Sequence, residues 1–183
     1  MVIALIGIIA AMATMIAPGV AKLAKADSGT KQVSEILRKA REEAIARRRY
    51  VQVAFDLTNS RMTVTRIDYD AALAPVQTVE QTVALEGGLT FAKPASIPAT
   101  NNPIASYAPN TNAVTYTAVS SQPTVVFTPE GMATDPVNNN PTDGTIFLSR
   151  PNETATARAL TLSGLTANIE RWQWATSAWT SAK

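Results

Sequence analysis

Residues 1–21, MVIALIGIIAAMATMIAPGVA, decide the fold of this chain because they hold no charged side chain. As a helix this stretch would span about 31 Å, close to the hydrocarbon thickness of a bilayer. It suits three interpretations: a buried core helix, a cleavable signal peptide or a retained membrane anchor. Uncharged core helices of this length are rare, and a signal peptide needs a basic region before its apolar stretch. A retained anchor is therefore favoured.

Charge appears only where this stretch ends. The first 50 residues hold nine basic and four acidic side chains, and all nine basic ones lie between Lys22 and Arg49. The remaining residues hold seven basic and ten acidic side chains. Lysines that follow an apolar span mark its exit from a bilayer, and a proline inside a helix favours a kink. We expect a membrane-spanning or filament-core helix over residues 1–28, kinked near Pro18.

The next segment has the spacing of an amphipathic helix. Over residues 30–49, apolar side chains recur at intervals of three and four positions, and charged residues fill the other faces. We predict that this stripe packs on the protein's own sheet, in preference to a partner: Val33, Ile36, Leu37, Ala40, Ala44 and Ile45.

From residue 50 onward the hydrophobic period changes to two, which is typical of strands. A hairpin follows the helix, with strands at 51–57 and 62–67, and further short strands are predicted at 76–85, 89–91, 114–119, 124–128, 145–149, 158–163 and 169–174. Segments rich in Pro and Asn, 93–112 and 129–144, predict long surface loops. The fold class is α+β: residues 29–183 form a head in which the β-rich part, 50–183, is a small antiparallel, meandering sheet.

The chain contains no His and no Cys. These absences exclude catalytic triads with a histidine base, thiolate nucleophiles, zinc clusters and disulfides. A loop with oxygen ligands, Asp135, Asn138, Asn140 and Asp143, superficially suits Ca²⁺, but Pro136 and Pro141 break the spacing of a calcium loop. We predict no catalytic residue, no metal site and no cofactor.

Two groups of side chains suit contact with a ligand. Arg47, Arg48 and Arg49 have the charge to bind phosphate, although arginines at a helix end also stabilise the helix dipole, which we favour. Trp172 and Trp174 alternate on one strand and suit either a partner platform or an edge of the core, and we favour the core. Trp179 lies beyond that strand, so we expect it to be exposed.

Several segments resemble one family. Residues 2–13, VIALIGIIAAMA, resemble the N-terminal helix of type IV pilins and pseudopilins just after their signature glutamate. Residues 41–48, REEAIARR, and the strand that follows resemble the helix-to-strand junction of the minor pseudopilins that include the H component of type II secretion and the T-type fimbrial minor pilin. Residues 127–131, 146–148 and 158–164 are similar to the closing strands of that family.

The resemblance implies a pilin-like fold and a non-enzymatic structural subunit of a type II secretion or type IV pilus-like filament. It implies a single-pass position in the bacterial inner membrane, with the head in the periplasm or outside the cell. Implied partners are other pilin or pseudopilin subunits, inner-membrane lipid before assembly, and the prepilin peptidase that precedes N-methylation. The helix would pack on lipid or on like helices through Val2, Ile3, Leu5, Ile6, Gly7, Ile8, Ile9, Ala10, Ala11, Ala13 and Pro18.

The sequence departs from the family at its start. Pilins carry a basic leader ending in glycine and a glutamate early in the mature chain, and alignment on Gly7 places Met1 after that glutamate. We expect a further N-terminal segment that carries both features. The alternative function is a membrane-tethered β-rich module that binds DNA, a glycan or a secreted protein. Nucleic acid is not the expected ligand, because residues 164–171 lack the basic pair of the relatives that take up DNA.

Overall fold

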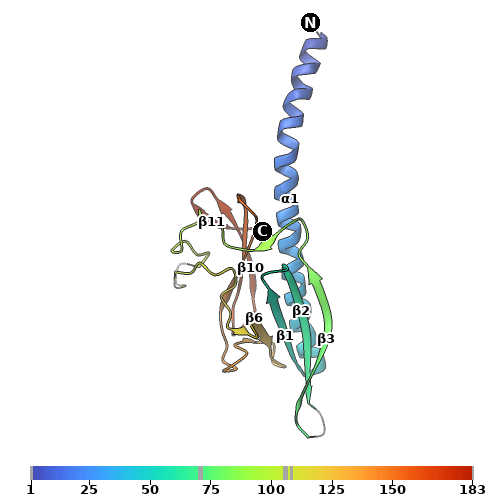
Figure 1. Cartoon of the computed structure of the whole chain (residues 1–183), viewed down its shortest axis with the longest axis vertical. Helices are drawn as coiled ribbons and strands as arrows, with labels where there is room; N and C mark the ends of the chain where they lie inside the picture. Colours follow the sequence, from blue (N-terminus) through green and yellow to red (C-terminus); the bar gives the residue numbers. More distant parts are fainter. Residues whose placement is uncertain (1, 70–71, 105–106, 108, 183) are drawn as a thin grey trace.

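A single long helix enters a β-rich head. The computed structural model describes residues 2–69, 72–104, 107 and 109–182, and it describes side chains from residue 19 onward. Helix α1 (Val2–Arg47) continues through Pro18 and through the Asp27-Ser28-Gly29 segment, so neither proline nor glycine ends it. Its N-terminal part projects from the head, and its C-terminal part lies along the head (Figure 1).

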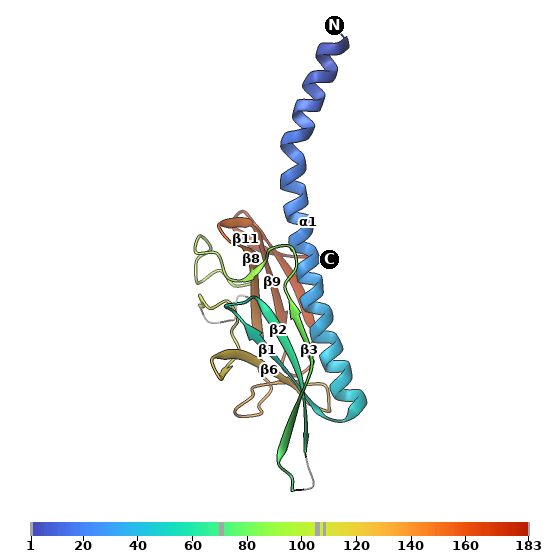
Figure 2. The ribbon, with the colours of Figure 1, turned by 45° about the vertical axis from the view of Figure 1, so that its right-hand side comes forward.

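The head consists of two antiparallel sheets. The strands are β1 (Tyr50–Asp56), β2 (Arg61–Tyr69), β3 (Pro75–Ala84), β4 (Thr90–Phe91), β5 (Ala118–Val119), β6 (Gln122–Phe127), β7 (Ala133–Thr134), β8 (Gly144–Arg150), β9 (Glu153–Leu162), β10 (Ile169–Ala175) and β11 (Ala178–Ser181). The first sheet has the order β3-β2-β1-β6-β5, with β7 paired to β6. The second has the order β11-β10-β9-β8-β4 (Figure 2).

The α+β class is confirmed, but the prediction of one meandering sheet is wrong. Strand β6 returns to pair with β1, in the register Val51↔Phe127, after some 65 intervening residues of other structure. The predicted strand at 114–119 is reduced to an isolated bridge, Val114↔Ile146, and to β5. Strands β7 and β11 were not predicted, because two-residue and four-residue strands have too few positions to show a period.

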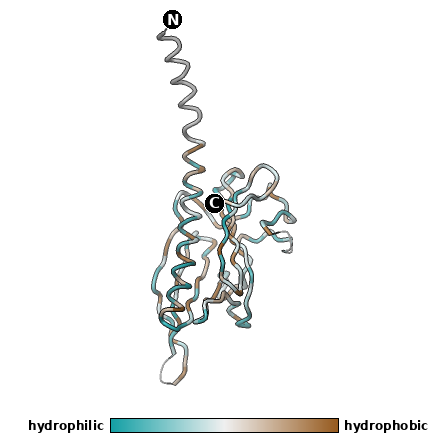
Figure 3. The backbone as a smooth tube through the Cα atoms, turned by 180° about the vertical axis from the view of Figure 1, so that it is seen from behind, coloured by the Kyte–Doolittle hydropathy of each residue, from teal (hydrophilic) through white to brown (hydrophobic). Residues whose placement is uncertain are grey.

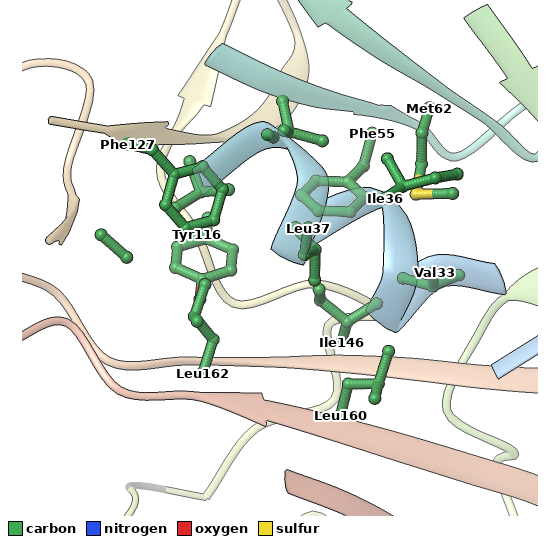
Figure 4. Packing of buried hydrophobic residues seen from close by; sticks show 14 of the residues in the cluster. Val33, Ile36, Leu37, Phe55, Met62, Tyr116, Phe127, Ile146, Leu160 and Leu162 are labelled. Atoms are coloured by element: carbon green, nitrogen blue, oxygen red, sulfur yellow. The ribbon is translucent and has the colours of Figure 1, made fainter. Parts of the chain in front are cut away.

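The core lies between the two sheets and is filled from one side by α1. Leu37 is fully buried, with Phe55 from β1 above it and Ile146 and Leu160 from β8 and β9 below it (Figure 4). The Phe55 ring meets Phe91 edge to face, with ring centroids 5.5 Å apart. Each such side chain contributes about 1.5–3 kcal/mol when fully buried, so the helix is part of the core of the head.

The projecting part of α1 differs from the part against the head. Residues 19–25 are exposed, and Ala26 is the first described residue of α1 to be fully buried. From there, hydrophilic and hydrophobic residues alternate around the helix (Figure 3). Within the described side chains, no helix is long and apolar enough to cross a membrane. The membrane helix was predicted over residues 1–28, and the side chains of residues 1–18 lie outside that part of the chain.

Candidate functional site

The contact between α1 and the head is the first part of the site. The stripe predicted to pack there is buried at five of its six positions: Val33, Ile36, Leu37, Ala40 and Ala44. Ile45 is the exception, with 44% of its surface exposed. It lies on the last turn of the helix, and a Cβ on Gly131 would lie 2.8 Å from its Cδ1 atom. The prediction that Ile45 packs into the head is therefore corrected to a partial contact.

A close contact at Gly29 brings a loop of the head against α1. A Cβ on Gly29 would lie 2.5 Å from the Leu89 Cδ1 atom and 3.2 Å from the Glu86 carbonyl oxygen. The loop between β3 and β4 therefore lies directly against the helix backbone. Gln32 fastens the same loop, because its Nε2 donates to the Ala84 carbonyl at 3.3 Å and its Oε1 accepts from the Glu86 amide at 3.2 Å.

Ion pairs hold α1 at the place where it leaves the head. Arg158 of β9 is 4% exposed, and its Nε donates to Asp27 Oδ1 at 2.6 Å. Its Nη1 donates to the Ala155 and Ala157 carbonyl oxygens at 3.3 and 3.0 Å. This arginine belongs to the site and was not predicted, because an arginine inside a strand pattern gives no signal of burial.

A second ion pair lies one turn toward the N-terminus. Lys22 Nζ donates to Glu153 Oε1 at 2.8 Å, and the other carboxylate oxygen of Glu153 lies 3.7 Å from Arg150 Nε. The hydrogen bond from Lys22 lowers the pKa of Glu153 below its usual value. The lysine predicted to mark the bilayer exit is thus paired with a carboxylate of the head.

The arginines at the other end of α1 are paired as well. Arg47 Nε lies 3.1 Å from Glu43 and its Nη1 lies 3.5 Å from Glu80 of β3. Arg66 of β2 bonds to the same Glu80 carboxylate. These carboxylates reduce the positive charge that Arg47 offers to an anionic ligand.

Arg48 and Arg49 complete this end. Arg48 has a φ of 52°, the left-handed conformation that ends many helices. Arg49 Nε lies 3.3 Å from Asp68, whose carboxylate also accepts from Arg66 at 2.7 Å. The Arg66 hydrogen bond lowers the pKa of Asp68. Of the three arginines considered as phosphate contacts, Arg47 and Arg49 are therefore both paired with acids of the β2–β3 hairpin.

The tryptophans form part of the second sheet. Trp174 and Trp179 face each other across β10 and β11, with ring centroids 5.3 Å apart, and Trp179 lies 5.6 Å from Phe147. Trp179 Nε1 donates to the Asn101 carbonyl at 3.0 Å. The expectation that Trp179 is exposed beyond the last strand is wrong, because β11 pairs it with Trp174 and leaves it half-buried. Trp172 is also half-buried, and its Nε1 donates to Thr161 Oγ1 at 3.0 Å.

The long loop after β4 is ordered by one lysine. Lys93 Nζ donates to the Ala99 and Asn110 carbonyl oxygens at 3.3 and 3.0 Å and to Asn102 Oδ1 at 3.2 Å. It also lies 5.0 Å from the centre of the Phe147 ring. Burial lowers the pKa of Lys93. The predicted surface loop is thus present but tied to the head.

In the loop considered for Ca²⁺, Asp135 accepts hydrogen bonds from the backbone of the loop itself. Asp135 Oδ1 accepts from the Val137 and Asn138 amides at 2.8 and 3.0 Å, and Oδ2 accepts from Thr117. These hydrogen bonds, the one from Thr117 first, lower the pKa of Asp135. Among the described residues, no three acidic side chains come together as a metal site.

The fold and the helix–head contacts define the pilin class of protein, a long helix whose second half is built into a small β head. A family model described as type II transport protein GspH matches residues 30–166, more than half of the chain. The chain therefore belongs to the GspH family and is a subunit of the minor pseudopilin and pilin class. Proteins of this family are components of membrane-associated filaments and are generally not enzymes.

Solved structures show the same fold. The chain is similar to the type IV minor pilin FimU of Pseudomonas aeruginosa, with 17% identity and a TM-score of 0.50 over 86% of this chain and 92% of that one. A second crystal form of FimU gives 18% identity and a TM-score of 0.49, covering 79% of this chain and 90% of that one. At this identity the likeness shows the fold alone. The search of curated proteins found no significant match.

Proposed function

We propose that this chain is a structural subunit that joins a type II secretion or type IV pilus-like filament through the apolar N-terminal part of α1. One observation carries the proposal: the helix is built into the head from Ala26 onward, while residues 19–25 are exposed in front of it. The residues before them, 2–18, are uncharged. An apolar helix is stable both in a bilayer and in a bundle of like helices, so it can move from one to the other.

The proposal assigns a role to each part of the chain. Within residues 1–28, the uncharged residues before Lys22 form the membrane and filament helix, and small residues such as Gly7, Ala10 and Ala11 allow neighbouring helices to approach closely. Residues 29–183 form the head, which lies in the periplasm or outside the cell. Before assembly the subunit sits in the bacterial inner membrane as a single-pass protein, and its partners in the filament are other pilin or pseudopilin subunits. A prepilin peptidase is the partner that processes the subunit before it enters the filament.

The ion pairs at the helix exit support this role. Asp27–Arg158 and Lys22–Glu153 join two successive turns of α1 to β9. Because ion pairs are directional, they fix the angle between the projecting helix and the head. A filament with helical symmetry needs one such angle in every subunit.

Co-purification with a filament tests the proposal. The chain is expressed with its own secretion or pilus components, and the filaments are sheared and sedimented. We expect the wild-type chain in the pellet and Ala11→Glu in the membrane or supernatant, because a carboxylate in a bundle of apolar helices costs several kcal/mol. Leu165→Glu places the same charge on an exposed head residue and should leave incorporation unchanged. Equal incorporation of both variants would contradict assembly through the helix.

The alternative, a tethered module that binds DNA, a glycan or a secreted protein, has less support. Its phosphate contacts would be Arg47, Arg48 and Arg49, and the first and last of these are held by Glu43, Glu80 and Asp68. We expect the full chain in detergent to pass through a heparin or DNA column at low salt. Salt-sensitive retention on DNA would favour the alternative.

A further inference from the structure

Two adjoining pockets line one side of α1 where it leaves the head. The first, about 230 Å³ in volume, lies between Asp27, Thr30 and Lys31 of α1 and the side chains of Arg158 and Arg171 from β9 and β10. The second, about 440 Å³, is lined by Leu23 of α1 together with Ala155 and Trp174. Arg158 and Gln173 line both pockets, so the two pockets adjoin each other, and together they are called the groove. Figure 2 shows β9 beside α1 at this level.

The first pocket is positively charged. It brings together three cations, Lys31, Arg158 and Arg171, and one carboxylate, Asp27. Arg158 is almost fully buried and uses its Nε and Nη1 atoms on Asp27 and two carbonyl oxygens. Within the described residues its Nη2 makes no hydrogen bond, so two N–H donors remain. A buried guanidinium with free donors binds phosphate well, and two further cations stand beside it.

The second pocket is more apolar and lies nearer the N-terminus of α1. Leu23 is two turns before Lys31 on the helix, and Trp174 faces the same side. Indole rings are frequent at the boundary between hydrocarbon and headgroups. The groove therefore has a cationic end inside the head and an apolar end that points toward the uncharged residues before Lys22.

We propose that this groove binds one anionic phospholipid. Its phosphate contacts Arg158, Lys31 and Arg171, and its acyl chains run past Leu23 and Trp174 along α1 toward the bilayer. The inference rests on the proposed function in one respect, because it requires residues before Lys22 to lie in a membrane before assembly. Binding there would place a headgroup against the Asp27–Arg158 pair and hold the head at a fixed height above the bilayer.

Charge and shape favour a lipid over other occupants. The helix of a second copy would present residues 2–21, which carry no charge to neutralise the cationic pocket. A free phosphate ion would fill the cationic pocket and leave the apolar one empty. A phospholipid matches both pockets in the order in which they occur along α1.

Native mass spectrometry of the full chain, released from detergent micelles, tests the proposal. Dioleoyl phosphatidylglycerol is the probe, and dioleoyl phosphatidylcholine is the zwitterionic comparison. We expect one phosphatidylglycerol bound per chain, at least about tenfold more tightly than phosphatidylcholine. Lys31→Gln with Arg171→Gln should weaken phosphatidylglycerol binding about tenfold or more, since each cation near an anionic headgroup contributes about fivefold. Leu23→Gln should also weaken it.

The control removes the same two charges elsewhere. Lys39→Gln with Arg61→Gln changes exposed residues of α1 and β2 that lie outside the groove, and it should bind phosphatidylglycerol like the wild type. Circular dichroism shows whether both double variants fold. Equal weakening in both, equal binding of the two lipids, or full displacement by about a hundredfold excess of inorganic phosphate would overturn the proposal. A change of oligomeric state in the Lys31/Arg171 variant without a change in lipid binding would assign the groove to a second copy and overturn it too.

The lipid test is independent of the filament test. A chain that enters filaments but does not select phosphatidylglycerol overturns the lipid groove alone. A chain that selects the lipid but does not co-sediment with filaments overturns the assembly role alone.

Discussion

Two of the stretches of α1 that touch the head are held by different forces. From Val33 to Ala44, contact is made by apolar side chains that sit between the two sheets, Leu37 foremost. From Lys22 to Asp27, contact is made by ion pairs to Glu153 and Arg158. Apolar burial provides most of the free energy but is not directional, whereas ion pairs provide less and fix geometry. The C-terminal part of α1 thus anchors the helix in the head, and the exit sets its direction.

The largest loss in the free energy of unfolding is expected at the apolar contact between α1 and the two sheets. Leu37→Ala should lower the free energy of unfolding by about 2–5 kcal/mol, because it leaves a cavity between the sheets. Urea denaturation of the full chain in detergent, followed by tryptophan fluorescence, measures the loss. Ile45→Ala removes a side chain that is half-exposed and should cost less than half as much. Similar losses in the two variants would show that the helix is not part of the core.

The second-largest loss of stability is expected at Arg158, the buried arginine where α1 leaves the head. Asp27→Asn leaves the Arg158 guanidinium buried without its counter-ion, and we expect a loss of about 1–3 kcal/mol. The exit geometry should loosen as well, which hydrogen exchange at residues 19–31 would show as faster exchange. Asp143→Asn is a control at an acid outside this contact. Unchanged exchange at the exit would contradict the directional role of this pair.

A comparable loss is expected at Gly29. Gly29→Ala brings a methyl group to within 2.5 Å of Leu89 and 3.2 Å of the Glu86 carbonyl, so the β3–β4 loop must move. We expect this to cost about 1–2 kcal/mol relative to Gly19→Ala, which gains the same helix propensity from alanine. Gly19→Ala is the matched control, because nothing lies within 4 Å of its Cβ position and alanine favours helix, so it should stabilise slightly. Thermal unfolding distinguishes the two. A stable Gly29→Ala variant would mean that the loop does not rest on the helix.

The smallest change in stability is expected from the ion pairs Lys22–Glu153 and Arg66–Asp68, which respond to pH. The pKa of Glu153 is lowered by Lys22 and that of Asp68 by Arg66, so both carboxylates stabilise the folded state above their ordinary pKa values. This contribution should be lost as the pH falls below about 4. Lys22→Gln should flatten the decline in melting temperature between pH 6 and pH 3. An unchanged pH profile in this variant would show that the pair contributes nothing.

The two stretches also differ in how well the sequence predicts them. The contact made by residues 33–44 can be predicted from the sequence, because burial between two sheets imposes a helical period on apolar residues. The ion pair at the exit cannot be predicted from the sequence. A buried arginine on a strand, Arg158, has no periodic pattern, and its partner Asp27 lies 131 positions away. The same holds for β11, which is too short to show alternation, and for the pairing of β6 with β1, which depends on a long connection. Gly29 looks like a helix breaker in the sequence and is a close-packed contact in the structure.

Cysteine cross-linking in bacterial membranes tests the central claim, that the projecting helix carries assembly while the head keeps it in place. The chain has no cysteine of its own, so every disulfide formed by a single-cysteine variant involves the introduced residue. Val20→Cys, 60% exposed on the projecting helix, should give disulfide-linked dimers under mild oxidation when the filament components are expressed. Leu165→Cys, 70% exposed on the head, should give far fewer. Dimers at Leu165 with none at Val20 would contradict the account.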